Sequence, residues 1–233
     1  VLAYNLKDPL LAKKEIRRAL TLAINEQALI AKIQNGYGSV CIGPYLPNSW
    51  ASNPKLKLIG YNPFKAKEIF LKNGFEFKDG YLTKDGKPLT FNILFDPKDQ
   101  NNEKITLLIR QQLQEIGIKL NIEQSKEENI YDNQALASRT FQIWLTGFAA
   151  HQDPAHMNYM DQDSPIGSII GASSFKELNK LLKAANQTYD QKKRQKIYHQ
   201  IHQRMYDEQV FGFLFYLQLL FAVDSRFTHT EDL

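Results

Sequence analysis

The segment Phe141-Gln-Ile-Trp-Leu-Thr-Gly-Phe-Ala-Ala-His-Gln-Asp-Pro154 is typical of a buried strand that ends at a glycine and continues into a polar loop. Proline is favoured at the first position of a helix, and Asp153 before it can accept hydrogen bonds from that helix's free N–H groups. We therefore expect a strand over residues 140–146 and a short helix over 154–160. Strand, polar loop and helix start in this order usually form the edge of a ligand crevice in an α/β sheet.

The preceding segment predicts the sheet to which this strand belongs. Apolar spacing indicates a strand over 89–95, a helix over 102–116 that Gly117 ends, and a strand over 118–123. Such βαβ crossovers are right-handed and make the two strands parallel. Upstream, the spacing and the capping residues predict helices from Lys13, over 26–35 after Asn25, and from Pro63 to Gly74, followed by a hairpin around Asp79-Gly80.

The remaining segments complete one domain. We expect a long irregular loop over 36–60, a helix over 127–137 and a loop over 161–171. Ser174 and Glu177 predict a capping box for a helix to Gln187, and Asp190 a cap for a helix to about Tyr206. Residues 210–223 are expected to be two strands that return to the sheet. With no internal repeat or flexible linker, residues 1–233 are predicted to form a single α/β domain with a mixed β-sheet flanked by helices.

The composition is that of an ordinary globular protein, with 43% hydrophobic and 23% charged residues. The net charge of +4 is scattered, as in Lys192-Lys193-Arg194, which favours solvated helix faces over a nucleic-acid-binding surface. No run reaches the roughly 18 apolar residues of a membrane span. The single cysteine, Cys41, excludes an internal disulfide and any multi-cysteine metal site. Because the chain opens at Val1, we expect it to be processed or excised, with any targeting signal upstream.

Two histidine clusters are candidates for chemistry. His151, Asp153 and His156 could bind a metal, but a capping aspartate and two surface histidines explain the same residues. His199 and His202 share one polar helix face, which predicts solvated side chains. Nucleophile and phosphate-loop motifs are missing, so we expect neither an enzyme nor a cofactor.

Four aromatic residues fall in predicted loops and outside the periodic core positions. They are Tyr37, Tyr45, Trp50 and Phe148. Aromatic side chains in loops either pin the loop to the core or belong to a recognition surface, since ligand sites combine apolar walls with a few polar groups. The sequence leaves both interpretations open.

An ordered set of motifs resembles the extracytoplasmic solute-binding proteins, family 5, that serve ABC importers of peptides, nickel and related solutes. The motifs are Arg17-Arg-Ala-Leu-Thr-Leu-Ala-Ile-Asn25, Asn35-Gly-Tyr-Gly38, Gly43-Pro44, Pro47-Asn-Ser-Trp50, Tyr61-Asn-Pro63, Ala66-Lys67, Asn73-Gly-Phe75, Asp85-Gly-Lys-Pro-Leu89, Gln111-Gln-Leu-Gln-Glu-Ile-Gly-Ile118 and the strand–Gly-Phe–Asp-Pro element. The set covers nearly the whole chain. Members of the family are about twice as long, so the resemblance implies one lobe, the second, of a two-lobed periplasmic-binding-protein-like (class II) fold, with half a ligand site.

The resemblance implies a bacterial substrate-binding component that captures an oligopeptide-like solute between two lobes and delivers it to an ABC permease, on the extracytoplasmic side of the membrane. A signal or lipoprotein sequence and the first lobe would lie upstream. Carried over by position, the ligand-binding residues would be Tyr45, Trp50, Phe148, His151, Gln152 and Asp153.

The ligand loop departs from the peptide-binding members, which place an aspartate before the Asp-Pro to pair with the ligand's α-ammonium. Residues 149–152 here are Ala-Ala-His-Gln, and a buried ammonium without a carboxylate partner is costly. His151 could serve neutral or anionic ligands, or a nickel or other metal chelate. The ligand-sensing domain of a transcription regulator, with a DNA-binding domain upstream, is an alternative in the same fold. An enzyme using His151 and Asp153 has no supporting motif.

Overall fold

In the computed structural model, the described residues are 1–127, 129–138, 140–149, 153–155, 163–172, 175–218 and 226. Their largest sheet has five strands in the order β7-β6-β8-β1-β9. The strands are β7 (Lys119–Gln124), β6 (Thr90–Phe95), β8 (Ile143–Leu145), β1 (Leu2–Tyr4) and β9 (Phe211–Gly212). β6 is parallel to both β7 and β8, whereas β1 runs antiparallel to β8 and β9. The predicted mixed sheet and the parallel βαβ unit, with α4 (Gln100–Glu115) as its crossover, are confirmed.

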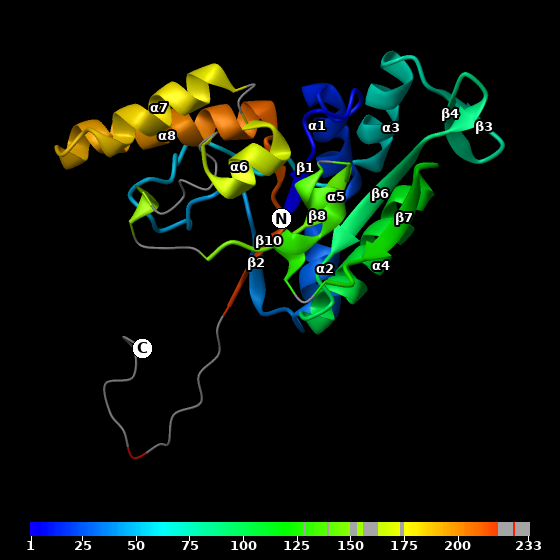
Figure 1. Ribbon diagram of the computed structural model, residues 1–233, viewed down its shortest axis with the longest axis horizontal. Coiled ribbons are helices and arrows are strands. Elements are labelled where there is room, and N and C mark those ends of the chain that lie inside the picture. The colour runs from blue at the N-terminus through cyan, green and yellow to red at the C-terminus, as the bar shows by residue number, and fades with distance from the viewer. Residues whose placement is uncertain are drawn as a thin grey trace.

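Alternate side chains of each strand enter two separate cores, because successive residues of a strand point to opposite faces of a sheet. In β8, Ile143 and Leu145 join one core and Trp144 joins the other. The first core also contains α1 (Lys14–Ala23), α2 (Glu26–Ile33), α3 (Pro63–Lys72) and α4. The second contains α6 (Pro165–Ile170), α7 (Lys176–Asn186) and α8 (Gln191–Glu208). Helices therefore flank both faces, with α7 and α8 side by side (Figure 1).

Local capping rules place several helix starts where the sequence predicts them. The side-chain oxygens of Asn25, Asn62 and Asp190 accept hydrogen bonds from the first turns of α2, α3 and α8. The Asp79-Gly80 turn joins β3 (Glu76–Lys78) to β4 (Tyr81–Lys84), and both turn residues have positive φ, as a two-residue hairpin loop requires. The β3–β4 hairpin, extended by β5 (Lys87–Pro88), stands at the opposite end of the molecule from α7 and α8 (Figure 1).

The predicted helix over residues 127–137 is wrong. The structure has a single 3-10 turn, η1 (Ile130–Asp132), and the short helix α5 (Gln134–Ala137). Asn129 accepts a hydrogen bond from the Tyr131 N–H, and the Asn133 amide donates to the Glu127 carboxylate. Side chains that bond nearby groups in this way compete with the backbone ladder of a helix.

Other segments also differ from expectation. The segment 161–171, predicted as a loop, contains α6, whose start at Ser164-Pro165 is a capping signal that we missed: Ser164 accepts a hydrogen bond from the Gly167 N–H. Phe175 occupies the N-cap position of α7, and its side chain makes no capping hydrogen bond. Ser174, the expected capping residue, and residues 156–160 of the expected short helix lie outside the described residues.

The C-terminal strands divide between two sheets. β9 joins the main sheet beside β1 as predicted, but β10 (Phe215–Leu217) pairs with β2 (Gly38–Val40) in a separate two-stranded ribbon. The segment 36–60, predicted as entirely irregular, thus contributes the strand β2. Residues 219–225 and 227–233 lie outside the described residues.

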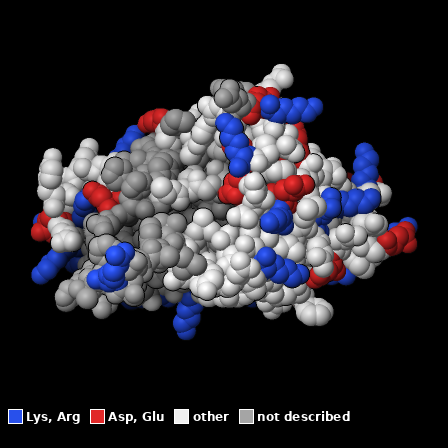
Figure 2. Space-filling model, turned by 90° about the horizontal axis from the view of Figure 1, so that it is seen from below, with Lys and Arg blue, Asp and Glu red and all other residues white. Residues whose placement is uncertain are grey.

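Charged side chains do not gather by sign on the face shown in Figure 2, where Lys and Arg lie scattered with Asp and Glu between them. Among the helices that the structure describes, none is long and apolar enough to cross a membrane.

Candidate functional site

The candidate ligand loop starts at the carboxyl end of β8, which is parallel to β6. Carboxyl ends of parallel strands meet at one edge of a sheet, where ligands of α/β proteins bind. Phe148 is half-buried, and its ring meets the ring of Phe211 edge-on with a centroid distance of 5.4 Å. Two other predicted site residues, His151 and Gln152, lie outside the described residues.

Asp153 has two partners in the structure. Its Oδ1 accepts a hydrogen bond from the Ala155 N–H at 2.9 Å, as a helix-capping aspartate does, and also lies 3.2 Å from Nη2 of Arg194 on α8. The Asp153 side chain is 53% exposed and that of Arg194 only 21%. The carboxylate at the end of the ligand loop is therefore already paired with a cation of the same chain.

Arg194 also contacts Trp50, which belongs to the other predicted part of the ligand site. Its guanidinium carbon lies 5.7 Å from the centroid of the Trp50 ring and 5.4 Å from that of Tyr198. The rings of Trp50 and Tyr198 meet edge-on at 5.5 Å, and Gln195 donates a hydrogen bond to the Trp50 carbonyl. Arginine is suited to such stacking because its planar guanidinium is weakly hydrated. One side chain of α8 thus connects Asp153 and Trp50, which are about a hundred residues apart.

Tyr45, one of the predicted ligand-binding residues, lies in the core. It is only 5% exposed, and its ring meets those of Tyr198 and His202 edge-on. Burial raises the pKa of its hydroxyl well above the usual value. The interpretation that a loop aromatic pins the loop to the core therefore holds for Tyr45. Tyr37, by contrast, is 50% exposed.

His202 is buried, so the prediction that this histidine is solvated is wrong. It is 1% exposed, and its Nδ1 accepts a hydrogen bond from the Asn53 N–H at 3.0 Å. Burial and the neighbouring His199 lower the pKa of His202 to about 4. A neutral His202 therefore fastens the loop that carries Tyr45 and Trp50 onto α8.

Sequence reasoning missed the part that α8 plays. We interpreted Lys192-Lys193-Arg194 as a solvated face, which holds for the two exposed lysines but not for Arg194. The available signal was the spacing of Arg194 and Tyr198, because residues four apart share one face of a helix. For the metal interpretation, His151 and His156 lie outside the described residues. Within the described part of the chain, no group of three or more His, Cys, Asp or Glu is arranged to hold a metal ion.

Residues 1–167 match the family model of the bacterial extracellular solute-binding proteins, family 5 (middle region). The chain belongs to this family of non-enzymatic solute-binding proteins of ABC importers. It is 28% identical over 222 residues to an oligopeptide-binding protein of Bacillus subtilis, covering 92% of this chain and 40% of that protein. It is 25% identical over 220 residues to a nickel-binding periplasmic protein of Escherichia coli, covering 88% and 40%. The chain thus spans about two-fifths of the length of these relatives.

Solved structures give the same picture of a partial match. The Bacillus subtilis oligopeptide-binding protein in complex with a nonapeptide superposes with a TM-score of 0.76 at 26% identity, over 93% of this chain and 44% of that one. A Campylobacter jejuni protein in complex with Ni(L-His) gives 0.80 at 24% identity, over the same shares. The predicted fold class, an α/β structure that matches part of the class II periplasmic binding proteins, is confirmed.

Proposed function

We propose that residues 1–233 form one ligand-binding lobe of a longer, extracytoplasmic solute-binding protein, which holds an oligopeptide-like solute between two lobes and delivers it to an ABC permease. The shares of the relatives' length support a single lobe, and the identity to the Bacillus subtilis oligopeptide-binding protein supports a peptide-like solute. In proteins of this kind, ligand contacts from both lobes favour the closed state.

The observation that carries the proposal is the connection of Trp50 and Asp153 by Arg194. It fixes an aromatic side chain beside the loop that follows β8, and a rigid aromatic next to polar groups is what solute sites require. The proposed ligand contacts are Trp50, Phe148, His151, Gln152 and Asp153. The buried Tyr45 packs against α8 and so supports the loop that carries Trp50.

The ion pair also bears on which end of a peptide this lobe can recognise. Asp153 is shared between Arg194 and the Ala155 N–H, so its charge is largely compensated. A free α-ammonium would therefore gain less from Asp153 than from a carboxylate without a cation beside it. We therefore expect contacts to the backbone and side chains of the peptide, and little preference for a free N-terminus.

Trp50 offers a test by fluorescence. Trp144, the second tryptophan of residues 1–233, is 1% exposed in the sheet, and the difference between wild type and Trp50→Phe isolates the signal of Trp50. A peptide and its N-acetylated form are titrated against the longer protein and against the 233-residue chain. We expect the longer protein to bind both forms at micromolar or lower concentration, with a signal that Trp50→Phe removes. Micromolar binding by the 233-residue chain alone would refute the single-lobe proposal, and a strong preference for the free N-terminus would refute the ligand assignment.

A metal chelate is the second candidate, because His151 occupies the loop position nearest the expected aspartate and a relative is described in complex with Ni(L-His). This candidate predicts that the longer protein binds nickel with histidine and that His151→Ala weakens this binding at least tenfold. His229→Ala is the matched control. Equal binding by both variants would exclude His151 as a ligand.

A further inference from the structure

A cavity of about 100 Å³ lies between the end of α1, the start of α2, the segments 40–42 and 58–61, and the end of α8. Its apolar wall is formed by Val40, Cys41, Ile42, Leu58, Ile59 and Phe213. A water molecule occupies about 30 Å³ in the liquid, so the cavity has room for a group larger than one water. None of these residues belongs to the proposed solute site.

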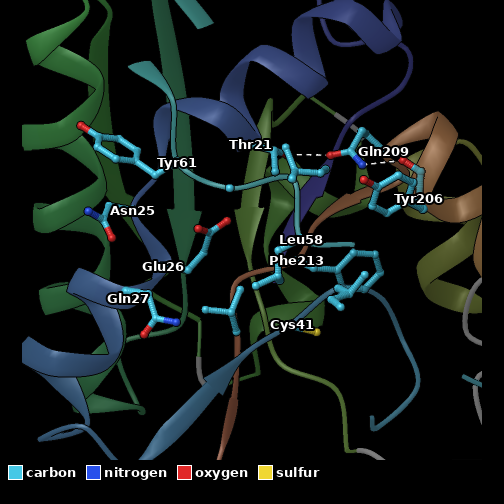
Figure 3. Close-up of a pocket in the computed structure, with 14 residues that line it drawn as sticks. Thr21, Asn25, Glu26, Gln27, Cys41, Leu58, Tyr61, Tyr206, Gln209 and Phe213 are labelled. Carbon is cyan, nitrogen blue, oxygen red and sulfur yellow. Dashed lines mark hydrogen bonds between the residues drawn. The ribbon is translucent and has the colours of Figure 1, made fainter. Parts of the chain in front are cut away.

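Among the described residues that line the cavity, Glu26 is the only charged one, and none is Lys, Arg or His. The residue is 8% exposed, and its carboxylate points toward the middle of the ring of side chains in Figure 3. Burial raises the pKa of Glu26 to about 7, offset only by its own backbone N–H. A buried carboxylate without a cation is costly, since desolvation of an ion amounts to several kcal/mol.

Three other polar residues of the lining, Thr21, Asn25 and Gln209, bond groups outside the cavity or one another. The Asn25 oxygen accepts from the Ala28 N–H, and the Gln209 amide bonds Thr21 and the Tyr206 carbonyl. Of the titratable groups near Glu26, the Cys41 thiol and the Tyr4 hydroxyl interact with it electrostatically; burial raises the pKa of both, to about 11 for Cys41, so neither supplies a positive charge. The Tyr61 hydroxyl points away and bonds Glu115. Glu26 is therefore a buried acid that has no cation beside it among the described lining residues.

We propose that this cavity binds a short-chain primary alkylammonium ion, with the ammonium group on the Glu26 carboxylate and the alkyl chain against Leu58 and Phe213. The primary ammonium supplies N–H donors to the carboxylate, and such charge-assisted hydrogen bonds are about twice as strong as neutral ones. The apolar wall removes the alkyl chain from water. This inference is independent of the proposed function, because it uses neither the ligand loop nor a second lobe.

The test is calorimetric titration of the protein with n-butylammonium chloride, with n-butanol as the neutral ligand of the same shape. At about pH 8.5, where Glu26 is ionised, we expect saturable binding of the amine and at least tenfold weaker binding of the alcohol. From about pH 8.5 to about pH 5.5 the ionised fraction of a group with a pKa near 7 falls about 30-fold, and the affinity for the amine should fall with it.

Three variants separate the site from general effects. Glu26→Gln keeps the shape and should weaken amine binding at least tenfold, whereas Glu123→Gln, on an exposed residue of β7, should leave it unchanged. Val40→Phe fills the cavity while keeping Glu26 and should also abolish binding. Circular dichroism establishes that each variant is folded.

The proposal is overturned if the amine gives no saturable heat, if n-butanol binds equally well, or if Glu26→Gln or the lower pH leaves the affinity unchanged. The test of the proposed function reads Trp50 and peptides, so the two can fail separately.

Discussion

Replacing Gly43 with alanine is expected to destabilise the fold through a single contact with His202. A Cβ at Gly43 would lie 2.2 Å from Nε2 and 2.5 Å from Cδ2 of the His202 ring, well inside van der Waals contact. The ring cannot move freely, because it is 1% exposed and its Nδ1 holds the Asn53 N–H. Overpacking a core costs about 1–3 kcal/mol, and a lost hydrogen bond adds about 1. We expect Gly43→Ala to lower the free energy of unfolding by about 2–4 kcal/mol.

The assay is urea unfolding followed by far-UV circular dichroism, with Gly147→Ala as the control. A Cβ at Gly147 would meet no described atom within 4 Å beyond its chain neighbours, and the φ of Gly147 is not positive. The change for this variant should therefore lie between zero and a gain of about 1 kcal/mol. A double-mutant cycle tests the cause: with His202→Ala the clash is gone, and the loss due to Gly43→Ala should shrink by about 1–3 kcal/mol. The reasoning is refuted if Gly43→Ala is within about 0.5 kcal/mol of wild type, or if its cost is the same without the imidazole.

Two further predictions concern buried ionisable groups. Arg17 is 1% exposed and donates hydrogen bonds to the carbonyls of Leu11, Ala12, Glu208 and Gln209. Arg17→Met leaves these buried acceptors without their donor, at a cost of about 1–3 kcal/mol each. Urea unfolding should therefore show a free energy of unfolding lower by at least about 3 kcal/mol, whereas Arg110→Met, at an exposed position, should change it hardly at all. The folded-state pKa of His202, about 4 against 6.5 when unfolded, gives stability that is present above pH 6.5 and is lost as the pH falls toward 4. Between about pH 7 and pH 4, wild type should therefore lose about 3 kcal/mol relative to His202→Asn, whose amide oxygen can still accept from the Asn53 N–H. The contribution of Glu26 to stability changes in the opposite direction: because its pKa is raised to about 7, this contribution grows as the pH falls. It is the same in both proteins and cancels in this difference. If the free energy of unfolding changes with pH in the same way for wild type and His202→Asn, the lowered pKa of His202 is contradicted.

Local chemistry explains what the sequence could predict. The caps at Asn25, Asn62 and Asp190, the Asp79-Gly80 hairpin and the parallel pairing of β6 with β7 depend on side chains within a few residues or within one crossover. The misses are also local in origin. The helix expected over 127–137 is interrupted by asparagine side-chain hydrogen bonds, and α6 begins at a Ser-Pro pair that we did not weigh.

By itself, then, the sequence determined the α/β class, the family and the segment that follows β8 as the candidate ligand loop. Only the tertiary structure decided that β1 lies between β8 and β9, that His202 is buried under Tyr45, and that Arg194 joins Asp153 to Trp50. The physical reason is that periodicity shows which side chains share a helix face but not which distant loop covers that face. On α8 the covering loop turns part of a polar surface into an interior, and buried polar groups then acquire partners.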